Sequence, residues 1–189
     1  MNIPVYLNSP MAVEATEIFT RHLGEHRLTK AQCQALSKVA HMVNSVNESR
    51  QLNEKKGPMI ILSASGMASG GRVVHHLKAF APKSNNTILF VGFQAAGTRG
   101  AAMLDGVKEI KIHGEYIPVR AKVERLNNLS AHADYEEILA WLSTLTTPPI
   151  NTFITHGEPV AADMMRRHVE ERFHWNVTVP EYLDEVLLS

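Results

Sequence analysis

Helical and strand-like spacings of hydrophobic residues divide the first part of the chain into short elements. An apolar run over 3–7 ends in the Asn-Ser-Pro triplet 8–10, which predicts a strand and then a helix, because Asn or Ser caps helices and proline suits the first helical turn. Apolar residues at helical spacing predict two helices, one from this triplet and one from Thr29, with Gly24 between them. The polar stretch 44–56 shows no period and is expected to be a loop.

Two apolar runs and a glycine-rich turn predict a βαβ unit in the middle of the chain. The run 59–62 is followed by the turn 65–71, by a helical pattern over 73–80 and by a second apolar run over 88–93. A crossover of this length returns the second strand beside the first, so we expect the two strands to pair in a parallel sheet. The first half of the chain is therefore predicted to have an α/β fold.

The second half of the chain also contains periodic segments. Polar and apolar residues alternate on both sides of the turn 113–115, which is typical of an antiparallel hairpin. Asp134 followed by Glu137 resembles a capping box and predicts a helix start. The expected elements are a helix near 101–104, a hairpin over 108–125, a helix from 134 to about 144, a strand over 150–155, a helix from Pro159 and a last strand over 177–179.

Composition narrows the class of protein. The 189 residues are 44% hydrophobic and 20% charged, which excludes a disordered tail. Nineteen basic side chains balance 19 acidic ones, which argues against a protein that wraps nucleic acid over its whole surface but leaves a local basic groove open. No apolar run or leader pattern indicates a membrane span, so we expect a cytoplasmic protein without a membrane partner. The single cysteine, Cys33, excludes an internal disulfide and a multi-thiolate metal site.

The glycine-rich turn 65–71 is the first candidate for chemistry. It stands between an expected strand and an expected helix, and backbone N–H groups at a helix N-terminus bind anions. Ser65, Ser69 and Arg72 could add donors. The spacing matches neither the dinucleotide-binding fingerprint nor the phosphate-binding loop of nucleotide hydrolases. On these residues alone, a tight structural turn and an anion site remain equally open.

Two histidines, His132 and His156, are the second candidate. A histidine can act as an acid or a base near neutral pH, since its unperturbed pKa is about 6.5. Taken singly, His132 is more often a cap or surface residue, and His156 is more often a buried, hydrogen-bonded one. The two lie 24 residues apart, and each is expected to end a strand and precede a helix, which would place both at one sheet edge. Two imidazoles at one edge suggest metal or phosphoryl chemistry.

Four motifs in one order carry a resemblance to a known family. They are Ser-Gly-Met-Ala-Ser-Gly-Gly-Arg-Val-Val-His-His-Leu at 65–77, Gly-Phe-Gln-Ala-Ala-Gly-Thr-Arg-Gly at 92–100, Ser-Ala-His-Ala-Asp at 130–134 and His-Gly-Glu at 156–158. The set resembles the β-CASP branch of the metallo-β-lactamase fold, whose members are RNA-processing nucleases, over nearly the whole chain. It implies an α/β fold in which a Rossmann-like parallel sheet, the β-CASP domain, is followed by the C-terminal part of a metallo-β-lactamase αββα fold.

The resemblance also implies domains, a cofactor and roles for single residues. Residues 1–115 would be an N-terminally incomplete β-CASP domain, and 116–189 the C-terminal segment of the metallo-β-lactamase domain, with two zinc ions and the RNA cleft between the domains in the full-length enzyme. His132 matches the histidine that protonates the leaving oxygen, and His156 matches a zinc ligand. DNA-cutting relatives tend to carry valine at that last position, so His156 favours RNA. The residues expected to bind RNA phosphates are Ser65, Gly66, Ser69, Gly70, Gly71, Arg72, Arg99 and Ser130.

The sequence departs from the family at the zinc site. The signature His-x-His-x-Asp-His is absent, which leaves His156 as the only matched ligand, and one imidazole cannot hold two zinc ions. An acidic residue is also usual at the position of Asn8. We therefore expect the C-terminal portion of a longer zinc-dependent ribonuclease, inactive alone, whose partners are RNA, the missing N-terminal half and, through the face left exposed, a second copy.

Two alternatives stay open. A non-catalytic RNA-binding or adaptor module of the same fold would have no chemical reason to place His132 and His156 together. A small-anion-binding Rossmann-like domain would need only the turn 65–71, and it leaves both histidines unexplained. Internal cleavage of RNA and trimming from an RNA end are equally compatible with the motifs.

Overall fold

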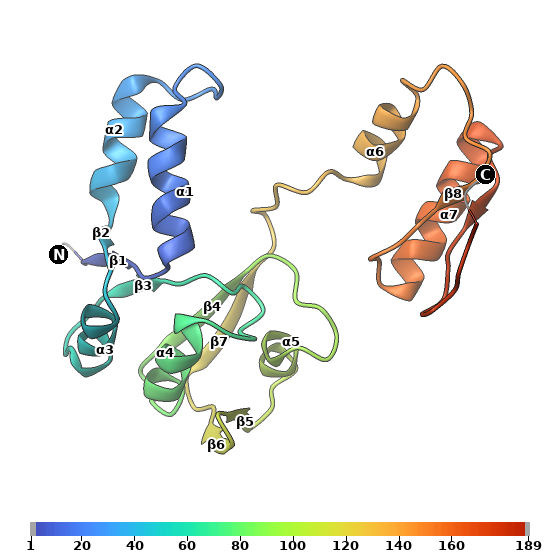
Figure 1. Cartoon of the computed structure of the whole chain (residues 1–189). Coiled ribbons are helices and arrows are strands. Elements are labelled where there is room, and N and C mark those ends of the chain that lie inside the picture. Colours follow the sequence, from blue (N-terminus) through green and yellow to red (C-terminus); the bar gives the residue numbers. More distant parts are fainter. Residues whose placement is uncertain (1–2, 188–189) are drawn as a thin grey trace. The chain divides into compact units, whose positions relative to one another are not determined.

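The computed structural model describes residues 3–187, without the side chain of Ser37, and divides the chain into two compact units (Figure 1). The first unit ends at Leu129 and the second begins at Ser130. Each unit has a hydrophobic cluster of its own. Within residues 3–187, no helix is both long and apolar enough to cross a bilayer.

The first unit combines helices with short, mostly parallel strands. Its elements in chain order are β1 (Val5–Leu7), α1 (Pro10–Arg21), α2 (Lys30–Val39), β2 (His41–Met42), α3 (Val46–Glu54), β3 (Ile60–Leu62), α4 (Arg72–Phe80), β4 (Thr87–Val91), α5 (Arg99–Leu104), β5 (Glu109–Ile112), β6 (Glu115–Pro118) and β7 (Lys122–Leu126). β1 pairs in parallel with β2 and β3, β4 pairs in parallel with β7, and β5 pairs antiparallel with β6. The mixed α/β fold with parallel strand pairs is confirmed.

The two strands on either side of α4 do not pair with each other, and that expectation was wrong. β3 pairs with β1, and β4 pairs with β7, where Ile88 lies opposite Val123. Both of these side chains pack against the core of the first unit, so β7 gains its place beside β4 by burying an apolar residue there. The hairpin expected over 108–125 is therefore confirmed only for β5 and β6, because the chain from Lys122 leaves it to join β4.

Helix starts follow the capping residues of the sequence. The side chains of Ser9 and Thr29 cap α1 and α2, as expected. The expectation of a loop over 44–56 was wrong, because α3 forms there. Ser45 and Glu48 make a capping box that satisfies backbone N–H groups at its start, and only two of its nine residues are buried. Its nine residues contain only two large apolar side chains, Val46 and Leu52, which are too few for a hydrophobic period to be recognised in the sequence.

The core of the first unit gathers side chains from α4, α5, β4 and the β5–β6 hairpin. Its buried members are Ala68, Val74, Leu77, Ala81, Phe90, Met103, Ile110, Ile112 and Ile117. Burial of a large apolar side chain contributes about 1.5–3 kcal/mol. Ala68 belongs to the glycine-rich turn, so this turn is anchored in the core and is not a free loop.

The second unit is smaller. Its elements are α6 (Tyr135–Leu142), β8 (Thr152–Phe153), α7 (Pro159–Phe173) and β9 (Val177–Thr178). β8 and β9 pair in parallel, and Leu139, Val169 and Val177 form the buried cluster between helices and strands. The capping box of Asp134 and Glu137 is confirmed at the start of α6.

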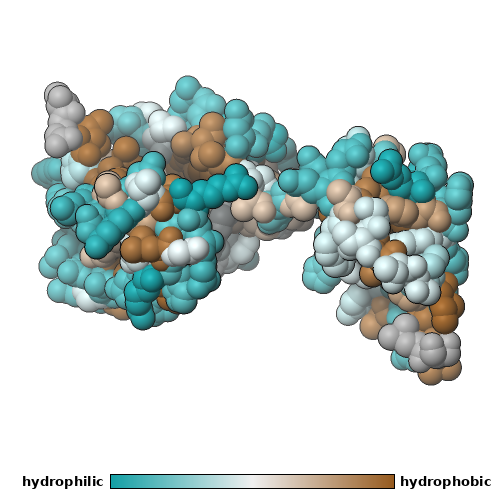
Figure 2. All heavy atoms as spheres, turned by 90° about the horizontal axis from the view of Figure 1, so that it is seen from above, coloured by the Kyte–Doolittle hydropathy of each residue, from teal (hydrophilic) through white to brown (hydrophobic). Residues whose placement is uncertain are grey.

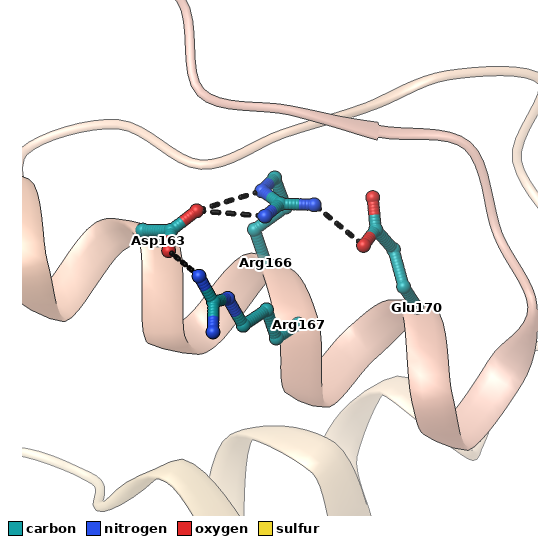
Figure 3. Close-up of polar contacts among 4 residues, drawn as sticks. All are labelled: Asp163, Arg166, Arg167 and Glu170. Atoms are coloured by element: carbon teal, nitrogen blue, oxygen red, sulfur yellow. Dashed lines mark hydrogen bonds and ion pairs between the residues drawn. The ribbon is translucent and has the colours of Figure 1, made fainter.

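Ion pairs follow one face of α7 (Figure 3). Arg166 lies between Asp163 at 2.7 Å and Glu170 at 2.6 Å, and Arg167 contacts Asp163 at 2.9 Å. Pairs at these helical spacings are typically worth about 0.2–0.5 kcal/mol each. Both carboxylates are thus engaged by arginines within the helix.

Apolar side chains are exposed on both units (Figure 2). Those of the second unit that are at least 70% exposed are Trp141, Ile150, Val160, Tyr182, Leu183 and Leu187. Exposed apolar surface favours association, and self-association stays a prediction.

Candidate functional site

The glycine-rich turn 65–71 has a defined and strained backbone. Ser65 and Ala68 adopt left-handed conformations with φ of 71° and 56°. The Ser65 hydroxyl accepts the N–H of Gly70 at 3.1 Å, and the Ser65 carbonyl accepts the N–H of Ala68 at 2.8 Å. A left-handed conformation costs a non-glycine residue about 1–2 kcal/mol, and the burial of Ala68 offsets this cost. Strain that packing holds in place is common at ligand-binding turns.

α4 begins at this turn without a capping side chain. Its N-cap is Gly71, and no side chain bonds to the N–H groups of its first turn. A phosphate site at a helix start needs such N–H groups. Five of the residues predicted from the sequence lie together in this turn, namely Ser65, Gly66, Ser69, Gly70 and Gly71.

The segment that follows β4 braces the turn. Gln94, which is buried, donates from Nε2 to the carbonyl of Gly66 at 2.9 Å, and the N–H of Gly100 donates to the carbonyl of Met67 at 3.0 Å. A Cβ atom at Gly100 would lie 1.8 Å from Oε1 of Gln94, so only glycine fits there without displacing this side chain. The second motif of the sequence therefore holds the first one in shape.

The guanidinium of Arg72 is bound inside the first unit. Its Nη1 donates to Oδ1 of Asn8 and to the carbonyl of Val43, both at 2.8 Å, and its Nη2 donates to the carbonyl of Asn44 at 3.0 Å. Arg72 thus ties the start of α4 to β1 and to the chain after β2, and it brings a positive charge to the turn.

Arg99 is bound in a similar way. Its guanidinium donates to the carbonyl of Ala68 and, at 2.9 Å from Nη2, to the carbonyl of Lys111. This arginine connects the start of α5 both to the turn and to the end of the β5–β6 hairpin.

Asn8, where the resembling family usually carries an acid, is fully buried in a polar network. Its Nδ2 donates to Oγ of Ser49 at 2.8 Å and to Nε2 of His76 at 2.6 Å. Since an amide NH₂ can only donate, Nε2 of His76 accepts and its proton lies on Nδ1, which donates to Oδ1 of Asn53 at 2.6 Å. Burial lowers the pKa of His76 to about 4, so this imidazole is neutral at pH 7.

A cleft of about 450 Å³ opens beside the turn, among α3, α4, the start of α5 and the turn between β5 and β6. Its lining residues are Val46, Ser49, Arg50, Asn53, Ser69, Gly70, Gly71, Arg72, Val74, His75, Arg99 and His113. Three are arginines and two are histidines, and none of these lining residues from the described part of the chain carries a carboxylate. A concentration of positive charge in a chain of zero net charge is suited to binding an anion.

The other predicted site residues lie in the second unit. Ser130, His132 and His156 are exposed there, and Oγ of Ser130 accepts the N–H of His132 at 3.1 Å. His156 has a left-handed backbone with φ of 65°. The sequence predicted that the two histidines follow neighbouring strands of one sheet, and this was wrong. β7, which precedes His132, pairs with β4, whereas β8, which precedes His156, pairs with β9.

A zinc site does not fit the described residues. Among residues 3–187, no three His, Cys, Asp or Glu side chains lie close enough together to share a metal ion. Zinc sites in proteins use three or four protein ligands, and His156 alone cannot supply them.

Comparison with known families finds two matches in the chain. The model of the Beta-Casp domain matches residues 1–103, and the model of the Zn-dependent metallo-hydrolase RNA specificity domain matches residues 116–180. The turn, the segment 94–100 and all lining residues of the cleft except His113 lie within the first match. Ser130, His132 and His156 lie within the second.

Curated relatives match much of the chain. A transcription termination factor FttA of Pyrococcus abyssi is 31% identical over an alignment of 200 positions, which covers 100% of this chain and 31% of that protein. A factor of the same name from Methanocaldococcus jannaschii is 34% identical over 98% of the chain and 31% of its own length. A ribonuclease of Thermus thermophilus is 36% identical over 74% of the chain and 34% of its own length. The chain thus spans about a third of the length of these relatives.

Proposed function

The chain belongs to the β-CASP family of RNA-processing nucleases, and from this premise we propose that it is the RNA-holding part of a longer enzyme that hydrolyses RNA phosphodiester bonds. The observation that carries the proposal is the uncapped start of α4 beside a cleft with three arginines and no lining carboxylate. We assign 1–115 to the β-CASP domain and 116–189 to the segment that specifies RNA.

The turn 65–71 binds a phosphate of the RNA strand. The uncapped N–H groups at the start of α4, after Gly71, and the hydroxyl of Ser69 donate to its oxygens, since phosphates bind readily at the N-termini of helices. The guanidinium groups of Arg72 and Arg99 already donate to groups of the protein, so their predicted contacts with phosphate are one part of their role. They fix the turn and add positive charge to it, and direct contacts with phosphate are secondary.

His132 and His156 have separate roles. His132 donates a proton to the oxygen that leaves the phosphorus, since an unprotonated alkoxide is a poor leaving group and an imidazole transfers protons near pH 7. The bond between Ser130 and the N–H of His132 shapes the loop, and the hydroxyl of Ser130 can also contact a phosphate oxygen. His156 would be one ligand of a zinc ion, and the other ligands would have to come from outside the described residues.

A non-catalytic RNA-binding module of the same fold is the second candidate. It needs only the turn and the cleft, which lie in the first unit. In this case RNA would bind at the turn and His132 would have no chemical task.

The two candidates are separated by His132→Ala and His156→Ala in the full-length enzyme that carries this segment. Loss of a general acid typically lowers turnover by about 10²–10⁴-fold, so we expect His132→Ala to slow RNA hydrolysis in this range with normal zinc content. His156→Ala should lower zinc occupancy as well as turnover. Elemental analysis and an RNA cleavage assay measure both. Equal zinc loss in the two variants would contradict the division of roles, and unchanged turnover in His132→Ala would contradict the role of His132 as the acid. A wild-type full-length protein that binds RNA without cleaving it would favour the non-catalytic module.

A further inference from the structure

The cleft continues beyond the turn to three side chains to which neither the family resemblance nor the comparisons assign a role. Arg50 lies on α3, His75 in the first turns of α4 and His113 at the turn of the β5–β6 hairpin, and all three line the cleft. We propose that they bind a second phosphodiester group of the same RNA strand, so that the strand crosses the cleft from the turn toward the hairpin. This inference rests on the proposed function.

Arg50 differs from the other two arginines of the cleft. Arg72 and Arg99 donate to groups of the protein, whereas Arg50 is exposed and has no hydrogen bond or ion pair with any residue that the structure describes. The donors of its guanidinium are therefore open to a ligand. A guanidinium binds a phosphate through two parallel hydrogen bonds, which makes Arg50 the strongest anion ligand of the outer cleft.

The two histidines lie side by side. The ring centroids of His75 and His113 are 5.1 Å apart, and the ring planes meet at 42°. Both side chains are exposed, and the backbone of His113 is left-handed with φ of 48° in the tight turn before Gly114. The hairpin thus holds one imidazole against the other. Each imidazole has an N–H donor in any protonation state, so the pair can donate to phosphate oxygens at neutral pH.

No carboxylate is among the lining residues of the cleft in the part of the chain that the structure describes. Glu115 interacts electrostatically with His113, and its carboxylate bonds Nζ of Lys78 at 2.8 Å. The hydrogen bond from Lys78 and its charge hold the pKa of Glu115 below the usual range, so the pair is ionised and adds no net charge. Arg50 itself forms no ion pair with a described residue, so its positive charge is available to an anion in the cleft.

The size and course of the cleft favour a strand over a single small anion. The lining includes Ser69 of the turn together with Arg50 and His113, and the cleft has a volume of about 450 Å³, which is within the range of about 300–1,000 Å³ typical of sites for larger ligands. Two phosphate-binding groups at the ends of one groove match the repeated charges of a nucleic acid backbone.

The test is the affinity of the 189-residue chain for a short fluorescein-labelled oligouridylate, measured by anisotropy at several KCl concentrations. Loss of one phosphate contact on single-stranded nucleic acid lowers the slope of log affinity against log salt by about 0.7. We expect Arg50→Gln to bind about fivefold more weakly at low salt with this smaller slope. The double variant His75→Gln, His113→Gln should also bind the RNA more weakly than the wild type. The matched control is Arg27→Gln, an exposed arginine outside the cleft, which should bind as the wild type does.

Two further arms separate this inference from the proposed function. Ser69→Asp places a carboxylate in the turn. If Ser69→Asp weakens binding but Arg50→Gln behaves like Arg27→Gln, the second phosphate site is contradicted and the phosphate site at the turn is supported. If only Arg50→Gln weakens binding, the second phosphate site is supported and the site at the turn is contradicted. Displacement of the RNA by inorganic phosphate at constant ionic strength would show a site for one small anion, and this would overturn the path of the strand. A wild-type chain without RNA affinity would overturn both proposals.

Discussion

His76 is the buried titratable side chain nearest to the candidate turn, and its contacts suit only the neutral imidazole. It accepts from Asn8 and donates to Asn53, and burial lowers its pKa from about 6.5 to about 4. Between these two values the unfolded chain binds a proton that the folded chain does not. Stability from this group is therefore complete above about pH 6.5 and is lost as the pH falls through about 4.

We predict that the free energy of unfolding of the first unit decreases between pH 6.5 and pH 4. Histidine NMR signals should show that His76 stays neutral to about pH 4, and urea unfolding followed by circular dichroism should show the loss of stability. His76→Gln should remove this component of the pH dependence, whereas His41→Gln, at an exposed histidine of the same unit, should retain it. An imidazole at position 76 that titrates near 6.5 would refute the prediction.

At the residue scale, the sequence identified the turn but not what holds it. Ser65, Ser69 and the glycines were recognised because glycine and serine between a strand and a helix are a local signal. The bonds from Gln94 to Gly66 and from Arg72 to Asn8 join residues 28 and 64 positions apart. The spacing of hydrophobic residues along the chain does not predict hydrogen bonds between polar groups so far apart in sequence. For the same reason, Arg72 was expected to contact phosphate although it donates to groups within the protein.

At the element scale, the packing of α5 against the segment before it depends on a single glycine. Gly100→Ala should destabilise the first unit by about 1–3 kcal/mol, because the added Cβ would lie 1.8 Å from Oε1 and 2.9 Å from Cδ of the buried Gln94. Displacing Gln94 would also break its bond to Gly66 and loosen the turn. Urea unfolding measures the first effect, and hydrogen exchange of the amides of the turn measures the second.

Gly24→Ala is the matched control, because no heavy atom lies within 4 Å of its added Cβ. It should leave stability and exchange nearly unchanged. If Gly100→Ala also leaves the free energy of unfolding and the hydrogen exchange of the turn unchanged, the contacts between the segment 94–100 and the turn do not stabilise the first unit.

Elements with strong local signals were predicted and the others were not. Caps at Ser9, Thr29 and Asp134 fixed the starts of three helices, because these side chains bond to backbone within their own first turn. α3 was missed because its surface is almost entirely polar. The partner of β4 was missed because strand pairing depends on which distant strand buries an apolar side chain beside it, and chain order does not show this.

In the whole molecule, the two units carry different groups of candidate residues. The first unit holds the turn, its brace and the basic cleft, and the second holds Ser130, His132 and His156. The family was predictable from four motifs and is confirmed. The roles of His132 as general acid and of His156 as zinc ligand stay predictions. Each role depends on a metal ion, its other ligands or a substrate, and the described residues do not form a metal site.

The central claim is that the turn at the start of α4 binds an RNA phosphate. The most direct measurement compares the affinities of the wild-type chain, Ser69→Asp and Ser84→Asp for a short single-stranded RNA. Like charges brought together cost several kcal/mol, so Ser69→Asp should bind at least about tenfold more weakly. Ser84→Asp adds the same charge at an exposed position outside the cleft and should bind as the wild type does. Equal affinities of all three proteins would contradict the account.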